Sequence, residues 1–185
     1  MRLVILGGPG AGKGTQAGQL CSYLSIPCIA TGEILRAAIA IATDLGKKAE
    51  PYVEKGELVP DETMIEFIRQ RLLMPDVTKG WLLDGYPRTA FQAEELDFLL
   101  DELEQKLDWA IYLNVSESIL KSRSAERSRP DDLPKIVERR LELFRQRTIP
   151  ILEYYDRRQR LLTVNGDRSP EQVQQDILTR LITPH

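Results

Sequence analysis

The sequence has few cysteines, no long apolar stretch and little net charge. Its 185 residues include only Cys21 and Cys28, whose spacing matches neither a CxxC redox pair nor paired zinc-ligand clusters. We therefore expect two reduced, ordinary thiols and no zinc. No run approaches the roughly 20 apolar residues of a membrane span, and the apolar run near the N-terminus is too short for a signal peptide. These features favour a cytoplasmic protein with no membrane partner.

The charge balance argues against a nucleic-acid partner. The formal net charge is −3, so no global field favours nucleic acid or an anionic membrane. Segment 121–147 is an exception, with nine basic residues against five acidic ones. The apolar share of 42% and the charged share of 29% are ordinary for a globular protein. A chain of this size forms one compact domain, so we expect a single domain over residues 1–185.

Short apolar runs alternate with helical patterns along the chain. The expected strands are residues 3–6, 27–30, 81–83, 110–115 and 161–164. Each run ends in residues suited to a turn or a helix start. The alternation predicts an α/β fold, a five-stranded parallel sheet with helices on both faces. Two segments look like insertions on this core, a helical one over about residues 30–59 and a short arginine-rich one over about 126–132.

A glycine-rich loop lies directly after the first expected strand. It fits the G-x-x-x-x-G-K pattern from Gly7 to Lys13, but Gly14 stands where Ser or Thr is general and the hydroxyl comes at Thr15. Glycines let backbone N–H groups converge on phosphate oxygens. The N-terminus of the following helix and Lys13 add positive charge for the β- and γ-phosphates. The loop therefore predicts nucleotide binding on a P-loop NTPase-type sheet.

An aspartate at the end of the third strand is a candidate metal ligand. Asp84 follows the apolar residues Trp81 to Leu83. In that position an aspartate usually caps a turn, but beside a P-loop it holds Mg²⁺, usually through water. We therefore expect Mg²⁺ to bind with ATP at Thr15 and Asp84.

Three segments carry a specific family resemblance. Residues 7–16, with glycine between the lysine and the threonine, resemble the P-loop of the adenylate kinase family. Residues 84–88 followed by Gln92 resemble its signature, with tyrosine where phenylalanine is common. Residues 31–36 resemble its monophosphate-binding helix, with glutamate at position 33 where aspartate is usual. The resemblance covers nearly the whole chain, up to about residue 170.

The resemblance implies an activity, partners and a set of site residues. It implies phosphoryl transfer from MgATP to AMP, giving two ADP, by a monomer of the short-lid, zinc-free branch with small nucleotides as partners. In the family, residues matching Gly10, Ala11, Gly12, Lys13, Gly14, Thr15, Arg127 and Gly166 bind ATP. Those matching Thr31, Arg36, Glu57, Leu58, Val59, Gly85, Tyr86, Pro87, Arg88, Gln92, Arg129 and Arg140 bind AMP. Catalytic roles fall on Lys13, Arg88, Arg123, Arg129 and Arg140.

The chemistry of these residue types agrees with the implied roles. Arg36 and Arg88 can each donate two parallel hydrogen bonds to a phosphate. The side-chain amide of Gln92 can form one hydrogen bond as a donor and one as an acceptor with the edge of an adenine base. Phosphoryl transfer needs placement, exclusion of water and charge neutralisation, which arginines on a closing lid provide. No general base is needed because the attacking AMP oxygen is already anionic near neutral pH.

Two other readings stay open on the sequence. A uridylate or cytidylate kinase has the same scaffold, and base choice rests on few contacts such as Thr31 and Gln92. A P-loop switch protein without kinase activity, or a nucleic-acid-dependent ATPase, would lack a second nucleotide pocket and the lid arginines. A nucleic-acid motor would also be larger or more basic.

Overall fold

The computed structural model describes residues 1–126 and 133–182. The strands are β1 (Arg2–Leu6), β2 (Cys28–Ala30), β3 (Trp81–Asp84), β4 (Trp109–Asn114) and β5 (Leu161–Asn165). The helices are α1 (Lys13–Leu24), α2 (Thr31–Ala40), α3 (Asp44–Val53), α4 (Asp61–Leu72), α5 (Ala90–Glu102), α6 (Glu117–Glu126), α7 (Pro134–Leu143), α8 (Ile149–Asp156) and α9 (Pro170–Ile182). A 3₁₀ turn, η1 (Pro75–Val77), precedes β3, and a π-helical turn, η2 (Phe144–Thr148), joins α7 to α8.

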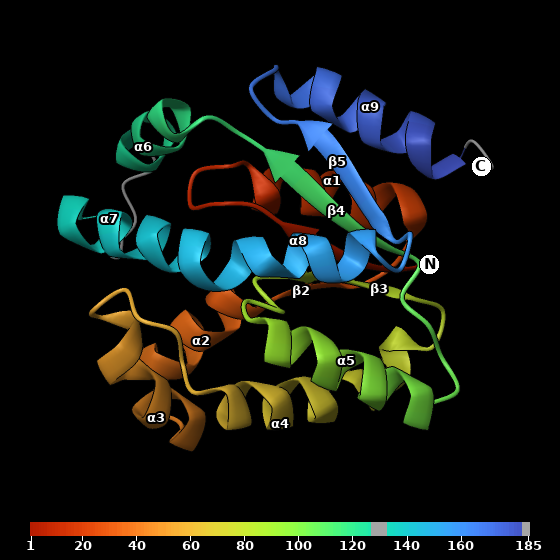
Figure 1. Ribbon diagram of the computed structural model, residues 1–185. Coiled ribbons are helices and arrows are strands. Elements are labelled where there is room, and N and C mark those ends of the chain that lie inside the picture. Colours follow the sequence, from red (N-terminus) through yellow and green to blue (C-terminus); the bar gives the residue numbers. More distant parts are fainter. Residues whose placement is uncertain (127–132, 183–185) are drawn as a thin grey trace.

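The five strands form one parallel sheet in the order β2-β3-β1-β4-β5. Figure 1 shows α1 and α9 on one side of this sheet and α4 and α5 on the other. The predicted α/β fold is therefore confirmed. In the register of the sheet, Ile5 is paired with Asp84 on one side and with Ile111 on the other. Residues that follow these strands therefore meet at one edge, where ligands of parallel sheets bind.

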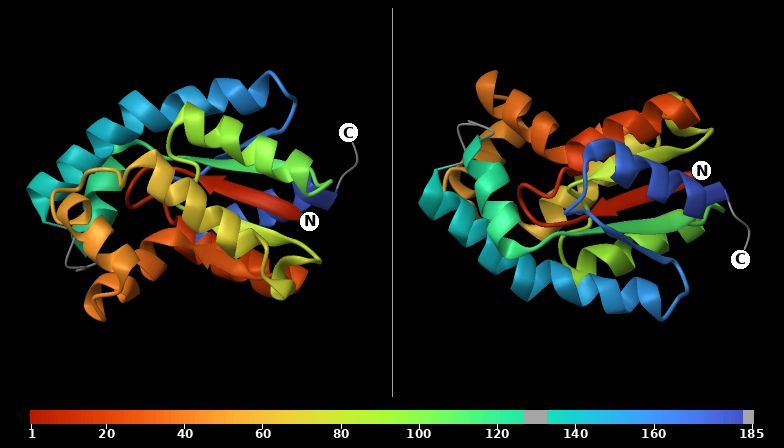
Figure 2. Two further views of the ribbon diagram at one scale, coloured as in Figure 1. Left: turned by 90° about the horizontal axis from the view of Figure 1, so that it is seen from below. Right: turned by 90° about the horizontal axis from the view of Figure 1, so that it is seen from above.

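The central strand is buried on both faces, as its continuous apolar sequence predicts. Val4 and Leu6 pack into one cluster, with residues of α4, α5 and α8. Leu3 and Ile5 pack into a second cluster on the opposite face, with residues of α1 and α9. All four side chains are at most 3% exposed. Figure 2 shows α4 and α5 in front of β1 from below, and α9 in front from above.

The helical segment after β2 folds as two short helices and a loop. Helix α2 begins directly at the end of β2, and the Thr43 hydroxyl caps α3 by accepting a hydrogen bond from the Gly46 N–H at 3.0 Å. A loop over residues 54–60 then leads into α4. Within residues 1–126 and 133–182, no helix combines the length and the apolar character that crossing a bilayer requires. Cys21 on α1 and Cys28 on β2 are free thiols.

Candidate active site

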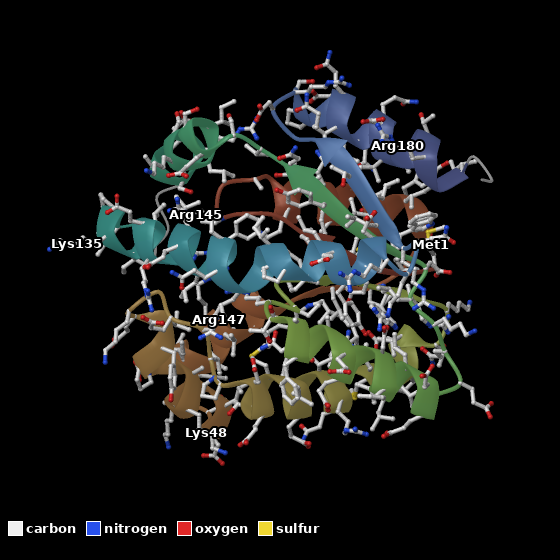
Figure 3. All side chains as sticks on the ribbon, in the orientation of Figure 1. Met1, Lys48, Lys135, Arg145, Arg147 and Arg180 are labelled. Carbon is white, nitrogen blue, oxygen red and sulfur yellow. The ribbon has the colours of Figure 1, made fainter. Side chains whose placement is uncertain are left out.

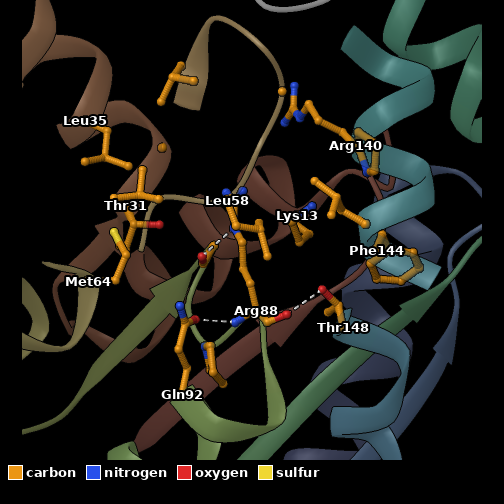
Figure 4. Close-up of a pocket in the computed structure, with 18 of the residues that line it drawn as sticks. Lys13, Thr31, Leu35, Leu58, Met64, Arg88, Gln92, Arg140, Phe144 and Thr148 are labelled. Atoms are coloured by element: carbon orange, nitrogen blue, oxygen red, sulfur yellow. Dashed lines mark hydrogen bonds between the residues drawn. The ribbon is translucent and has the colours of Figure 1, made fainter. Parts of the chain in front are cut away.

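A cavity opens at the carboxyl edge of the sheet, between the glycine-rich loop and the helices that follow β2 and β3. The side chains drawn in Figure 4 converge on it from α1, α2, the loop after α3, the loop after β3, α7 and η2. Its lining includes Gly7, Pro9, Lys13, Thr31, Gly32, Leu35, Arg36, Val53, Gly56, Glu57, Leu58, Val59, Met64, Gly85, Pro87, Arg88, Gln92, Arg140, Leu143, Phe144 and Thr148. Sequence positions more than a hundred residues apart therefore share one site.

The glycine-rich loop presents an open helix N-terminus. Gly12 precedes α1 in a left-handed conformation, with φ of 88°, and no side chain caps the helix. The first turn of α1 also contains no acidic residue. The first N–H groups of a helix without a side-chain cap carry partial positive charge and bind anions. The local structure therefore suits phosphate groups, as the sequence predicts.

Close packing against α6 explains why the loop needs glycine. Gly10 has a φ of 83°, and a Cβ atom added there would lie 2.4 Å from the Leu120 carbonyl oxygen and 2.7 Å from the Ser124 Oγ atom. Any other residue would combine backbone strain with a steric clash. Helix α6 therefore packs directly against the loop, and no residue of 117–126 lines the cavity.

Three polar side chains lie close to the N-terminus of α1. The ammonium of Lys13 donates hydrogen bonds to the carbonyl oxygens of Gly7 at 2.8 Å and Gly8 at 3.0 Å. The Asp84 carboxylate lies 3.8 Å from the Cβ position of Gly14, so the end of β3 faces the first turn of α1. Thr15 is exposed on that turn. A lysine, a carboxylate and a hydroxyl thus surround the anion-binding end of α1.

The loop after β3 forms the floor of the cavity. Gly85 has a φ of 91°, and a Cβ atom there would lie 2.4 Å from the Thr31 hydroxyl. That hydroxyl is buried and donates to the Asp84 carbonyl oxygen at 3.0 Å. The guanidinium of Arg88 turns back over the loop and donates through Nε to the Gly85 carbonyl oxygen at 2.7 Å. The loop therefore fixes an arginine at the centre of the cavity, as Figure 4 shows.

The Gln92 side chain is buried and held at both ends of its amide. Its Oε1 atom accepts a hydrogen bond from the Arg88 N–H at 2.7 Å, and its Nε2 atom donates to Asp61 Oδ1 at 2.7 Å. Each end keeps capacity for one further bond, since Oε1 has a second lone pair and Nε2 a second N–H. Tyr86 lies below, only 1% exposed, and donates to the Gln92 carbonyl oxygen at 3.2 Å. Burial raises the pKa of Tyr86.

Comparison with known proteins decides the family. The sequence model described as adenylate kinase matches residues 5–160. The chain belongs to the adenylate kinase family. A protein named adenylate kinase 2 from Nostoc sp. is 68% identical, over 98% of this chain and 99% of its own length. An adenylate kinase 2 from Synechocystis sp. is 56% identical, over 98% and 100%, and an adenylate kinase 1 from Nostoc sp. is 44% identical, over 97% and 98%.

This membership confirms the predicted family and enzyme class, an ATP:AMP phosphotransferase. The cavity of this adenylate kinase family member contains many of the residues that the sequence assigned to AMP. These are Thr31, Arg36, Glu57, Leu58, Val59, Gly85, Pro87, Arg88, Gln92 and Arg140. Of the residues assigned to ATP, Lys13 lines it. The side chain of Tyr86 lies instead in the core.

Other predicted residues lie elsewhere. The guanidinium of Arg123 on α6 donates to the carbonyl oxygens of Gly166 at 2.9 Å and Arg168 at 3.5 Å, and it does not line this cavity. Arg127 and Arg129, with nearly all of the expected lid over about 126–132, fall outside the described residues. The described arginines that meet in the cavity are therefore Arg36, Arg88 and Arg140.

Several lining residues were not predicted from the sequence. Leu35 and Met64 are buried residues of amphipathic helices, a pattern that indicates packing rather than a site. Phe144 and Thr148 lie on η2, where Thr148 donates to the Arg88 carbonyl oxygen at 2.9 Å. Single π-helical turns often occur at functional sites, but the sequence 144–148 has no feature that identifies one. These side chains give the cavity an apolar wall.

Proposed function

We propose that the cavity is the AMP half of the active site and that the glycine-rich loop holds MgATP beside it. The observation that supports this most directly is that Lys13 of the loop lines the same cavity as Arg36, Arg88 and Arg140. Four cationic groups around one space favour phosphate groups meeting there, because lysine and arginine form strong, charge-assisted hydrogen bonds with phosphate oxygens. Transfer of the γ-phosphoryl group of ATP to AMP then gives two ADP.

The residue types suggest a division of labour. The backbone N–H groups of residues 10–15 and the Lys13 ammonium bind the phosphates of ATP, while Arg36 and Arg88 bind the phosphate of AMP. Arg140, Arg123 and the two lid arginines Arg127 and Arg129 neutralise charge on the transferring group. Gln92 meets the adenine edge through its spare lone pair and its spare N–H, with Thr31 and residues 57–59 beside it. The backbone of Gly166 contacts the ATP base.

The residues present fit Mg²⁺ bound with ATP. Asp84 faces the first turn of α1, where Thr15 offers a hydroxyl, and both groups supply the oxygen ligands that this hard cation prefers. Magnesium needs no protein cage, since one or two carboxylates plus substrate phosphates and waters complete its shell. When bound, it would neutralise phosphate charge. Asp84 and Thr15 would orient it, directly or through water.

The acceptor is the sharpest test of this proposal. We would measure initial rates of diphosphate formation with AMP, UMP, CMP and GMP under saturating MgATP. AMP should give the highest rate. A higher rate with UMP or CMP would identify a pyrimidine kinase, whereas the absence of ADP formation from ATP and AMP would favour a nucleotide-binding switch. We also propose a cytoplasmic monomer that acts on free nucleotides and not on nucleic acid, which equilibrium sedimentation and cell fractionation can check.

A further inference from the structure

An ion pair joins the loop after α3 to α7, across 82 residues of sequence. The guanidinium of Arg139 donates through Nε to Glu57 Oε1 at 2.7 Å and through a terminal nitrogen to Glu57 Oε2 at 3.1 Å. The other terminal nitrogen donates to Glu142 Oε2 at 2.6 Å, one turn along α7. The Arg139 hydrogen bonds hold the pKa of Glu57 below its ordinary value. Both oxygens of Glu57 are therefore held by one planar group, the geometry that is strongest for arginine and carboxylate.

The backbone beside Glu57 packs closely on the same helix. Gly56 has a φ of 70°, and a Cβ atom there would lie 2.9 Å from Ile136 Cγ2 and 3.4 Å from Arg140 Cγ. Figure 1 shows the loop between α3 and α4 lying beside α7. The loop residues 56–59 form part of the cavity wall, and Arg140, the next residue after Arg139, lines the cavity from α7. Arg139 thus ties one wall of the cavity to another.

We propose that Arg139 is a positioning residue for AMP, which fixes loop 56–59 against α7 so that this wall of the acceptor site is formed before AMP arrives. The inference rests on the proposed function. Arg139 itself does not line the cavity, so it acts through Glu57 and the backbone of residues 57–59. Without the ion pair, loop 56–59 samples other positions, and only a fraction of the molecules has the loop position that binds AMP. The apparent affinity for AMP falls by that fraction.

Two other arginines form ion pairs with carboxylates other than Glu57. Arg145 on η2, labelled in Figure 3, pairs with Glu117 on α6 at 3.3 Å. Arg69 offers a closer match to Arg139: it pairs with Glu102 at 2.7 Å, and its side chain is 39% exposed against 37% for Arg139. Because the Arg69 pair joins α4 to α5 away from the cavity, it is a control for loss of a surface ion pair.

The experiment compares Arg139→Gln with Arg69→Gln in steady-state kinetics, varying AMP at saturating MgATP and MgATP at saturating AMP. Arg139→Gln should raise KM for AMP by about two- to fivefold, the range expected for a half-exposed pair, with KM for ATP unchanged. Arg69→Gln should change neither constant. The increase should shrink in high salt, because screening weakens the pair in the unaltered protein. Arg139→Lys keeps the positive charge but cannot form the two-point hydrogen bond to Glu57. Its KM for AMP should therefore lie between the values of the unaltered protein and of Arg139→Gln.

A double-mutant cycle tests whether Glu57 is the partner that matters. Glu57→Gln should raise KM for AMP to a similar extent, and the double variant should be no worse than either single variant. Three results would each overturn the inference. These are an unchanged KM for AMP in Arg139→Gln, an equal rise in KM for AMP and for ATP, and additive effects in the double-mutant cycle. Assays of the unaltered protein distinguish failure of this inference from failure of the proposed function. If the unaltered protein forms ADP from ATP and AMP, and Arg139→Gln has the same KM for AMP, only the positioning role of Arg139 is refuted.

Discussion

Replacing Lys13 by methionine separates the chemistry of the site from the stability of the fold. The half-buried ammonium of Lys13 donates to the carbonyl oxygens of Gly7 and Gly8. Hydrogen bonds of a charged group contribute about 1.5–3 kcal/mol each, and a half-buried ammonium falls at the low end of this range. Methionine keeps most of the apolar stem of lysine. The free energy of unfolding should therefore fall by about 3 kcal/mol, less than the total stability of a typical domain, and the variant should remain folded.

The effect on turnover should be much larger. Loss of one preorganised donor to developing charge costs about 2.7–4 kcal/mol in the transition state, which is about 10²- to 10³-fold in kcat. Lys121→Met is a suitable control, because Lys121 is exposed on α6 and pairs with Glu117 at 3.0 Å. It removes the same charge outside the cavity and should keep nearly full activity.

A coupled assay of ADP formation and urea unfolding of the same samples would test this. If Lys13→Met kept turnover within about tenfold of the unaltered protein, our assignment of Lys13 to the phosphates would be refuted, since one charged donor at the reacting group is worth at least about 10²-fold. If the variant instead lost much more than about 3 kcal/mol of stability, its low activity would reflect the fold and not the chemistry.

The remaining predictions concern stability. Gly10→Ala should lower the free energy of unfolding in urea by about 1–3 kcal/mol, because position 10 has a positive φ and no room for a Cβ atom. Gly18→Ala, on an open face of α1, should instead raise it by about 0.4–1 kcal/mol, and a loss there would contradict the backbone reasoning. The hydroxyl of Tyr155 is buried without a hydrogen-bond partner among the described residues, so Tyr155→Phe should be neutral or stabilising. Tyr154→Phe removes a 2.7 Å bond to the Asp97 carboxylate and should cost about 1.5–3 kcal/mol. Equal changes in the thermal stability of the two variants would refute this difference.

The strands could be predicted because their signal is local. Each expected strand lies within about one residue of the observed one, so that 3–6 is observed as Arg2–Leu6 and 110–115 as Trp109–Asn114. Burial on both faces requires continuous apolar runs, and such runs need no knowledge of the tertiary structure. The start of α7 has a local explanation as well. Pro134 occupies its first turn, where its missing N–H has no partner to lose.

The contacts within the site could not be predicted in the same way. The P-loop was recognisable because its groups are contiguous from Gly7 to Thr15. By contrast, the bond from Gln92 to Asp61 joins two helices, and the pair between Glu57 and Arg139 spans 82 residues. Helical spacing placed Arg123 on a defined face, but it did not predict the bond from Arg123 to the carbonyl oxygen of Gly166, which lies just after β5. Such partners depend on how elements pack, which no local pattern encodes.

Three cationic side chains of the predicted site donate hydrogen bonds to the same kind of acceptor, a backbone carbonyl oxygen at the end of a strand. Lys13 donates to Gly7, Arg88 to Gly85 and Arg123 to Gly166. Each of these glycines is the first residue after a parallel strand, respectively β1, β3 and β5.

Because all these strands end at the same edge, carbonyl groups just beyond them hold the cations along that edge. β3 and β1 are neighbours in the sheet, whereas β4 separates β1 from β5. Lys13 and Arg88 therefore line one cavity while Arg123 lies farther along, on the side where the loop after β5 is expected to border ATP. A carbonyl oxygen is a neutral acceptor, whereas a phosphate oxygen is itself charged and forms stronger bonds with the same cationic donors. Exchange of these carbonyl contacts for phosphate contacts would thus favour nucleotide binding without any rearrangement of the sheet.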